Sequence, residues 1–253
     1  MLSLSPLNDF PYIKKGDNIA EIISSSLQHN GLSLLNGDIL VIAQKIISKS
    51  EGRLINLNSV SPSDKAHEIA SISKKNPRLI ELILQESSRI IRVRPGTIIV
   101  EHRLGFICAN AGIDHSNVII DNDKNEYVLL LPKNPDKSAD FIRSYFEINN
   151  NISIGVLIND SHGRAWRLGV VGTTIGLSGL PGLVDMRGKS DLFGGNLRTT
   201  QIGTADELAG AASLIMGQGN EGIPVIHVRG FPYKLRKSNL QELIRPTKKD
   251  LFR

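Results

Sequence analysis

The chain has 253 residues, of which 40% are hydrophobic and 22% are charged, and its net charge is +5. This length and composition are typical of one large globular domain or two small ones, and they exclude a disordered chain. The single cysteine excludes a disulfide framework and a cysteine-rich zinc site. No apolar run approaches the roughly 18 residues that span a bilayer, and no signal peptide is visible, so we expect a cytoplasmic protein without a membrane partner.

The positive charge is concentrated at the C-terminal end. Residues 229–253 contain eight Lys or Arg and two Asp or Glu, whereas residues 1–228 contain 22 and 23, respectively. Because the rest of the chain is nearly neutral and aromatic residues are only 5% of the total, we expect no nucleic-acid partner. Residues 231–253 are interpreted as a basic C-terminal tail that is exposed to solvent or contacts a partner subunit.

Helices and strands alternate from the start of the chain. Asp17 is the expected N-cap of a helix that has Ile19, Ile22 and Ile23 on one face, and the segment 38–44 predicts a buried strand. Two further helices are predicted, one capped by Ser61 in the segment 61–64 and one that begins at Asn76-Pro77. A hairpin follows, with its turn at Pro95-Gly96 between strands 90–93 and 97–101.

The C-terminal half shows the same mixture. The pattern predicts a strand over 127–131, a turn over 132–136, a helix containing Ile142, Tyr145 and Phe146, and buried strands over 152–158 and 224–228. Thr204 and Glu207 form an expected capping box for a helix that Gly217 ends.

The predicted fold class is α+β (mixed α/β), because the strands and helices do not follow a strict βαβ order. Most of the 23 glycines lie between Gly155 and Gly222, where we expect irregular loops that carry the site. The prediction is one domain over 1–253 with two possible lobes, about 1–150 with a scaffold-like N-terminal part and about 151–230 with the glycine-rich site.

Two acidic residues, Asp114 and Asp160, each follow an apolar predicted strand. Such acids can hold hard divalent cations that bridge phosphates, or they can simply cap the following turns. His115 and His162 lie beside them as possible ligands or general bases, although exposed loop histidines are the simpler interpretation. The segment Gly217–Gly222 is a possible phosphate cradle or an ordinary helix-to-strand turn.

Other catalytic motifs are missing or incomplete. The sequence lacks H-E-x-x-H and G-x-S-x-G, and the segment ending in Gly188-Lys189-Ser190 has leucine where a Walker A loop needs glycine. Four arginines make the glycine-rich half cationic, which suits phosphate or carboxylate recognition or a solvated surface with salt bridges: Arg164, Arg167, Arg187 and Arg198. Trp166, between two of them, is expected to pack rather than to stack on a ligand.

Five ordered segments resemble the coenzyme F420-0:γ-glutamyl ligase family. They are GDILVIAQKIISKSEGR (37–53), ANAGIDHSNV (109–118), LLLPKNPDKSADFIR (129–143), NDSHGRAWRLGVVGTTIGLSG (159–179) and TADELAGAASLIMGQGNEGIPVIHVRG (204–230). The similarity extends from about Phe10 to about Arg229.

The resemblance implies a GDP-forming acid–amino-acid ligase. GTP would activate the carboxylate of a deazaflavin precursor as an acyl phosphate, and the amine of L-glutamate would attack it. The family uses Mg²⁺ or Mn²⁺, is helped by K⁺, and forms an intertwined homodimer of two-part α+β subunits. No covalent protein nucleophile is expected, since phosphoryl transfer depends on positioning and charge neutralisation.

The resemblance also implies roles for individual residues. Asp114, Asp160, Ser161 and Gln218 would hold metal. The nucleotide would contact Phe10, Pro11, Tyr12, Ile13, Ala43, Gln44, Lys49, Asn117, Met216, Gly217, Gln218, Gly219, Asn220, Glu221, Gly222 and Ile223. We add the hypothesis that the four arginines bind the polyanionic deazaflavin substrate.

One position departs from the family pattern. Gln218 stands where family members often have a metal-binding glutamate, and a neutral amide offers one carbonyl ligand but no negative charge. Two alternatives therefore stay open: a family member that ligates a different acid and amine, and a metal-dependent nucleotide-binding protein without ligase activity.

Overall fold

The computed structural model describes residues 1–116, 118 and 125–250. The α-helices in this part of the chain are α1 (Ile19–His29), α2 (Gln44–Ser50), α3 (Asp64–Ser73), α4 (Pro77–Gln85), α5 (Pro135–Asn150) and α6 (Thr204–Met216). The strands are β1 (Ser3–Pro6), β2 (Ile39–Ala43), β3 (Leu54–Asn56), β4 (Ser87–Arg94), β5 (Thr97–His102), β6 (Ile107–Ala109), β7 (Tyr127–Leu129), β8 (Gly155–Arg164), β9 (Arg167–Ser178), β10 (Val184–Asp185), β11 (Gln201–Ile202) and β12 (Val225–Arg229).

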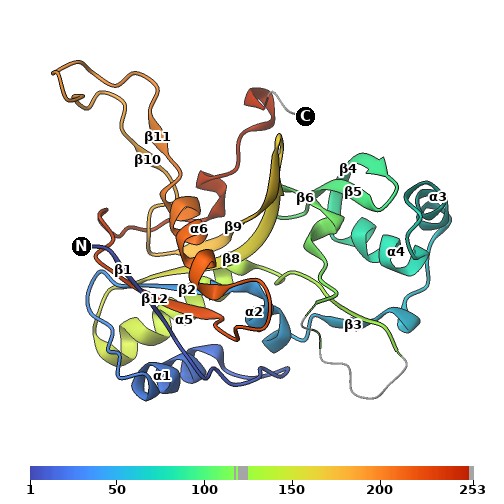
Figure 1. The fold of residues 1–253 in the computed structure, drawn as a ribbon, viewed down its shortest axis with the longest axis horizontal. Helices are drawn as coiled ribbons and strands as arrows, with labels where there is room; N and C mark the ends of the chain where they lie inside the picture. Colours follow the sequence, from blue (N-terminus) through green and yellow to red (C-terminus); the bar gives the residue numbers. More distant parts are fainter. Residues whose placement is uncertain (117, 119–124, 251–253) are drawn as a thin grey trace.

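The main sheet has five strands in the order β1-β12-β2-β8-β9 (Figure 1). Only β2 and β8 pair in parallel, and the other neighbours pair antiparallel. The sheet brings together strands from both ends of the chain, because β2 lies between β12 and β8. The mixed α+β class predicted from the sequence is confirmed.

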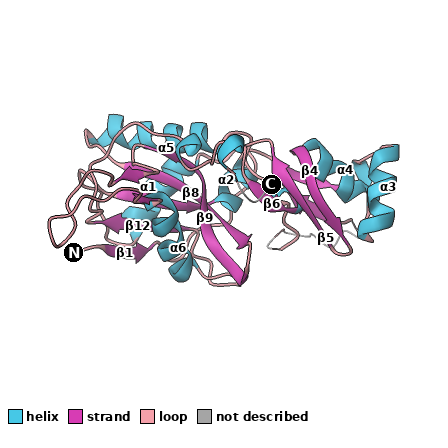
Figure 2. Ribbon diagram, turned by 90° about the horizontal axis from the view of Figure 1, so that it is seen from above, coloured by secondary structure: helices cyan, strands magenta, loops and turns pink. Residues whose placement is uncertain are grey.

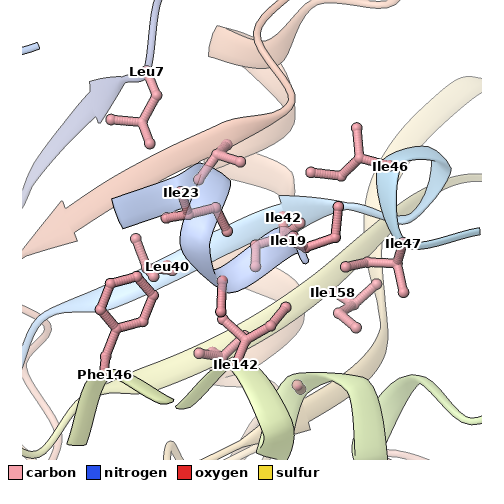
Figure 3. Close-up of a cluster of buried hydrophobic side chains, with 14 of the residues drawn as sticks. Leu7, Ile19, Ile23, Leu40, Ile42, Ile46, Ile47, Ile142, Phe146 and Ile158 are labelled. Atoms are coloured by element: carbon pink, nitrogen blue, oxygen red, sulfur yellow. The ribbon is translucent and has the colours of Figure 1, made fainter. Parts of the chain in front are cut away.

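Helices cover both faces of this sheet. Leu40 and Ile42 of β2 face a core with α1 and α5, whereas Ile39 and Val41 face a core with α6. This alternation follows from the period of two in a strand, and burial on both faces explains why the run 39–43 is continuously apolar. Figure 3 shows the first of these cores, in which Phe146 of α5 lies beside Leu40.

A smaller three-stranded sheet, β4-β5-β6, forms the other end of the molecule together with α3 and α4 (Figure 2). It has a hydrophobic core of its own, built from residues such as Ile80, Ile83 and Val100. Phe106, in the turn between β5 and β6, packs against this core and against both cores of the main sheet. In the sequence, β3 comes between α2 and α3, and β7 comes before α5. These two strands form a short antiparallel pair.

The long β8–β9 hairpin differs most from the sequence prediction. The predicted strand 152–158 begins later and runs to Arg164, and β9 occupies a stretch where we expected irregular loops. Two of its glycines permit close packing instead of turning the chain. A Cβ at Gly172 would lie 2.3 Å from the Ala209 carbonyl oxygen of α6, and one at Gly176 would lie 2.3 Å from Pro135 of α5.

Two predicted helix caps are wrong in position. The side chain of Asn18, not Asp17, caps α1, while Asp17 accepts a hydrogen bond from the Lys14 N–H. Ser63, not Ser61, caps α3. Each segment contains more than one residue type that can cap, so the spacing alone did not select between them.

The expected capping box at α6 is also wrong. Thr204 is the first helical residue, and Gly203 occupies the cap position without a side-chain hydrogen bond. The Thr204 hydroxyl instead donates to the Pro181 carbonyl oxygen, 2.9 Å away, which fastens the helix to the preceding loop. The end of the helix at Gly217, the helix start at Asn76-Pro77 and the hairpin at Pro95-Gly96 are confirmed.

The basic C-terminal segment is not simply exposed to solvent. Leu240 is buried in the core on the α6 side, and its backbone N–H donates to the Asp136 carboxylate. Arg236 pairs with Glu242, whose carboxylate accepts from the backbone of Gly182. This part of the tail therefore packs against its own chain.

Residues 183–203 form an arm around β10 and β11 that extends away from the main sheet (Figure 1). Leu192 and Phe193 on this arm are 90% and 93% exposed. Among the described residues, no helix has both the length and the apolar character needed to cross a membrane. The lobe boundary near residue 150 stays a prediction.

Candidate functional site

A cavity of about 440 Å³ opens where the parallel pairing of β2 and β8 ends. Ala43 and Asn159 are register partners at this point, so the start of α2 and the continuation of β8 lie side by side. Ligands of α/β proteins commonly bind outside the carboxyl ends of parallel strands. The walls come from five segments of the chain: 10–13, 43–46 with Lys49, Val118, 159–161, and 216–224 with Ser213.

Asp160 lies inside β8 and not beyond its end, which corrects the sequence interpretation. The strand continues through it in pairing with Thr173 of β9, after a register shift between Ile158 and Asn159. Its side chain is only 9% exposed, and its Oδ2 accepts a hydrogen bond of 2.9 Å from His162 Nε2. Ser161, the next residue, also lines the cavity.

Asp114 approaches the same region from the other side. Its backbone bonds to Leu129 in both directions, and its Oδ2 accepts from Gln44 Nε2 at 2.8 Å. Burial raises the pKa of the Asp114 carboxyl, Lys45 opposes this shift, and the charge of Asp160 adds to it. The charge of Asp160 thus disfavours ionisation of Asp114, and a bound cation would relieve this repulsion.

The two neighbouring histidines have different environments. His115 is 47% exposed and its Nδ1 lies 3.6 Å from Glu126 Oε1. The His162 side chain is 10% exposed and its ring packs against Phe106, with 5.2 Å between ring centroids. The interpretation as an exposed loop histidine is wrong for His162.

Two lysines of α2 stand one turn apart beside the cavity. Lys49 is among the predicted nucleotide contacts, and burial, together with the charge of Lys45, lowers its pKa. Lys45, which the sequence reasoning missed, lies with its Nζ 3.5 Å from Asp114 Oδ2 and donates to the Ser116 hydroxyl. The i, i+4 spacing from Lys49 was the signal that could have identified it.

The glycine-rich loop after α6 forms one wall. Gly217 ends the helix with φ +71°, a conformation that glycine adopts without strain. Gln218 Nε2 donates to Ser213 Oγ at 3.1 Å, and the Glu221 carboxylate accepts from the Gly219 N–H at 2.8 Å. Backbone hydrogen bonds within the loop lower the pKa of Glu221, so this loop already stabilises a negative charge.

The donor set fits a hard divalent cation. No group of three or more His, Cys, Asp or Glu side chains that could hold a metal occurs in the described part of the chain. A cation at Asp114 and Asp160 would therefore need further oxygen ligands from Ser161, Gln218 or a phosphate, as Mg²⁺ sites commonly do. The Oδ1 of Asn159 is buried in this wall without a hydrogen-bond partner, as expected where a ligand completes the polar contacts.

None of the four arginines predicted to bind the substrate is among the described residues that line the cavity. Arg164 and Arg167 face each other at the tip of the β8–β9 hairpin, while Arg187 pairs with Asp185 on the arm that also carries Arg198. Trp166, expected to pack, is 88% exposed.

All other predicted nucleotide-contacting residues belong to the walls, except Asn117, which lies outside the described residues. Their roles toward a ligand, like the substrate role of the arginines, stay predictions.

Comparisons with known proteins identify the relatives of this chain. The family model described as F420-0:Gamma-glutamyl ligase matches residues 8–230. A coenzyme F420:L-glutamate ligase of Methanothermobacter thermautotrophicus is 44% identical over 254 residues, covering 100% of this chain and 99% of the relative. Proteins of the same description from Methanococcus maripaludis and Methanocaldococcus jannaschii are 43% and 40% identical, covering 93% and 97% of this chain and 90% and 94% of their own lengths.

Proposed function

Since the chain belongs to the F420-0:gamma-glutamyl ligase family, we propose that it joins L-glutamate to the coenzyme F420 precursor F420-0 through an amide bond, using GTP. The observation that carries this proposal is the cavity itself. One hollow gathers the carboxylate of Asp160, two lysines and a glycine-rich loop from separate parts of the chain, and the Asp114 carboxylate contacts two residues of its wall, Gln44 and Lys45. These are the groups needed to bind a nucleotide triphosphate and to neutralise its charge during phosphoryl transfer.

The proposed reaction has two steps. A carboxylate oxygen of F420-0 attacks the γ-phosphorus of GTP, the bond to the β-phosphate oxygen breaks, and GDP leaves. The amine of L-glutamate then attacks the carbonyl carbon of the acyl phosphate, loses a proton, and displaces inorganic phosphate. The product is an amide, and repetition on its new carboxylate would add further glutamates.

In this proposal the protein positions the reactants and balances charge. Lys49 interacts with the phosphates, and the backbone N–H groups of the loop beginning at Gly217 contact phosphate oxygens. Mg²⁺ or Mn²⁺ held by Asp114, Asp160, Ser161 and Gln218 would supply positive charge to the γ-phosphate, and K⁺ would act as a supporting ion.

A direct assay tests the proposal. The protein is incubated with F420-0, L-glutamate, Mn²⁺ and either GTP or ATP, and the products are measured by mass spectrometry together with released phosphate. We expect one or more added glutamate residues, more product with GTP, and one phosphate per amide formed. The Asp160→Asn variant is expected to lose most of this activity while keeping its fold. Absence of glutamyl product from the wild-type protein would refute the proposal.

A second candidate function follows from Gln218. Its side-chain amide is neutral and is already bonded to Ser213 Oγ, so it adds no charge to a second metal site. A family member with this change would ligate a different acid or amine, or would bind nucleotide without ligating. Phosphate release that depends on another amino acid in place of glutamate would favour the former, and GTP binding without turnover the latter.

We further propose that the protein acts in the cytoplasm as a homodimer. The exposed apolar side chains of Leu192 and Phe193 on the arm support a contact with a second subunit, because isolated chains rarely expose adjacent large apolar residues on an extended arm. The single cysteine, Cys108, is buried and unpaired, which is compatible with a reducing compartment.

A further inference from the structure

We propose that His162 is a positioning residue that fixes the orientation of the Asp160 carboxylate for metal binding. The inference rests on the proposed function, since it concerns the same metal-dependent site. No role for His162 follows from the function proposed above, in which Asp160 and Ser161 hold the metal.

The hydrogen bond between the two side chains has a defined direction. An ionised carboxylate can only accept, so the His162 Nε2–H donates to Asp160 Oδ2, over 2.9 Å. The two residues are separated by one position in β8, which places their side chains on the same face of the strand. A carboxylate with one oxygen held in this way presents the other to a cation in a fixed orientation.

The imidazole ring is itself held from behind. Phe106 packs against it with ring centroids 5.2 Å apart, and Phe106 stacks in turn on His102 at 5.1 Å with an interplanar angle of 5°. His102 is fully buried, with its Nε2 3.7 Å from the Glu86 carboxylate. The orientation of His162 therefore depends on the part of the molecule built from β4, β5 and β6.

This arrangement differs from ordinary core packing. The ring of His162 packs on Phe106, but its Nε2 is directed at a carboxylate that lines the cavity. Hydrogen bonds from a second layer of residues to metal-binding carboxylates orient the ligands, and their loss typically weakens metal affinity or activity by about 10- to 100-fold.

The test compares Mn²⁺ binding to the full-length protein, measured by electron paramagnetic resonance with GDP present, for three variants. His162→Leu removes the donor and keeps an apolar side chain against Phe106. His162→Gln keeps an N–H donor near the position of Nε2. His115→Leu is the matched control, because His115 also follows a metal-site acid but contacts Glu126.

We expect His162→Leu to raise the Mn²⁺ dissociation constant by about tenfold or more, and His162→Gln to restore it to within about threefold of wild type. At saturating Mn²⁺, kcat of the leucine variant should stay within about threefold of wild type, because the loss is in ligand orientation and not in the reaction itself. His115→Leu should bind Mn²⁺ like the wild type.

Any one of four results would overturn the inference, and the first three concern the variants and the coordination of the metal. They are unchanged Mn²⁺ affinity in a folded His162→Leu protein, a glutamine variant no better than the leucine variant, and spin-echo coupling of Mn²⁺ to an imidazole nitrogen, which would make His162 a direct ligand. A wild-type protein that binds no Mn²⁺ would also overturn it. Tight Mn²⁺ binding that depends on His162, without glutamyl product, would instead refute only the proposed function.

Discussion

At the residue scale, Lys49 is the positive charge that the proposed phosphate contact most depends on. It lines the cavity, and burial together with Lys45 lowers its pKa. Since a hydrogen bond to a charged group contributes about 1.5–3 kcal/mol, we expect Lys49→Met to raise KM for GTP by about 10- to 100-fold. Steady-state kinetics at saturating Mn²⁺ check this. Lys65→Met on the exposed face of α3 is the control, and an equal effect in both variants would contradict the assignment.

Glu86 gives the stability a pH dependence away from the site. Burial opposes its ionisation, but the neighbouring His102, Arg53 and Arg103 outweigh burial and lower its pKa from 4.5 to about 2. Because the pKa is lower in the folded state, the stabilisation is present above about pH 4.5 and is lost as the pH falls toward 2.

The lowered pKa of Glu86 predicts how the stability of a variant without this charge depends on pH. Glu86→Gln should reduce the free energy of unfolding by on the order of 3 kcal/mol at neutral pH, and the difference from wild type should shrink as the pH approaches 3. Urea denaturation across this range measures it. Glu68→Gln, on the exposed face of α3, should show neither effect. A constant difference at every pH would mean that the charge of Glu86 does not contribute.

At the element scale, the β8–β9 hairpin shows why the sequence prediction failed where it did. Glycines are ordinarily typical of turns, and we therefore expected irregular loops across 155–222. In β9, however, Gly172 and Gly176 let α6 and α5 approach the strand backbone on opposite faces. The requirement for a missing Cβ comes from helices distant in sequence, so no local pattern contains it.

Other elements were predictable because their signals are local. The continuous apolar run of β2 and the Asn76-Pro77 start of α4 depend on residues within one element. The predicted helix caps were wrong by one or two residues where a neighbouring side chain could cap the helix equally well. At the site, the pairing of Ala43 with Asn159 brings the walls together, and such a long-range contact has no signature in spacing.

A pair of glycine substitutions tests the account of the hairpin. Gly172→Ala should lower the free energy of unfolding by about 2 kcal/mol or more, because its Cβ would overlap the Ala209 carbonyl oxygen. Gly163→Ala in the same hairpin has no atom within 4 Å of its Cβ and should change stability by less than about 0.5 kcal/mol. Chemical denaturation of both variants decides it, and similar values would refute the close-packing explanation.

At the scale of the whole molecule, the arm around β10 and β11 is the basis for the proposed homodimer. The double substitution Leu192→Glu and Phe193→Glu should give a folded monomer, because buried apolar contacts would be replaced by paired negative charges. Sedimentation velocity measures the change, with Ile148→Glu on the exposed side of α5 as the control. A wild-type protein that is monomeric, or a double variant that stays dimeric, would contradict the assignment to the arm.

The basic C-terminal segment, residues 231–253, is also interpreted differently once the whole molecule is considered. The basic segment suggested an exposed tail, but Leu240 and the Arg236–Glu242 pair fasten much of it to the body. The composition showed the excess positive charge of this segment correctly. It could not show how the segment packs, because the packing depends on contacts with Gly182 and Asp136.

The central claim is that this cavity activates a carboxylate by phosphorylation, and isotope transfer tests it most directly. F420-0 labelled with ¹⁸O in its reacting carboxylate is incubated with the protein, GTP, Mn²⁺ and L-glutamate, and the released phosphate is analysed by mass spectrometry. An acyl phosphate requires one carboxylate oxygen to leave with the phosphate, so we expect ¹⁸O in the phosphate in proportion to the amide formed. Amide formation with unlabelled phosphate would contradict the account.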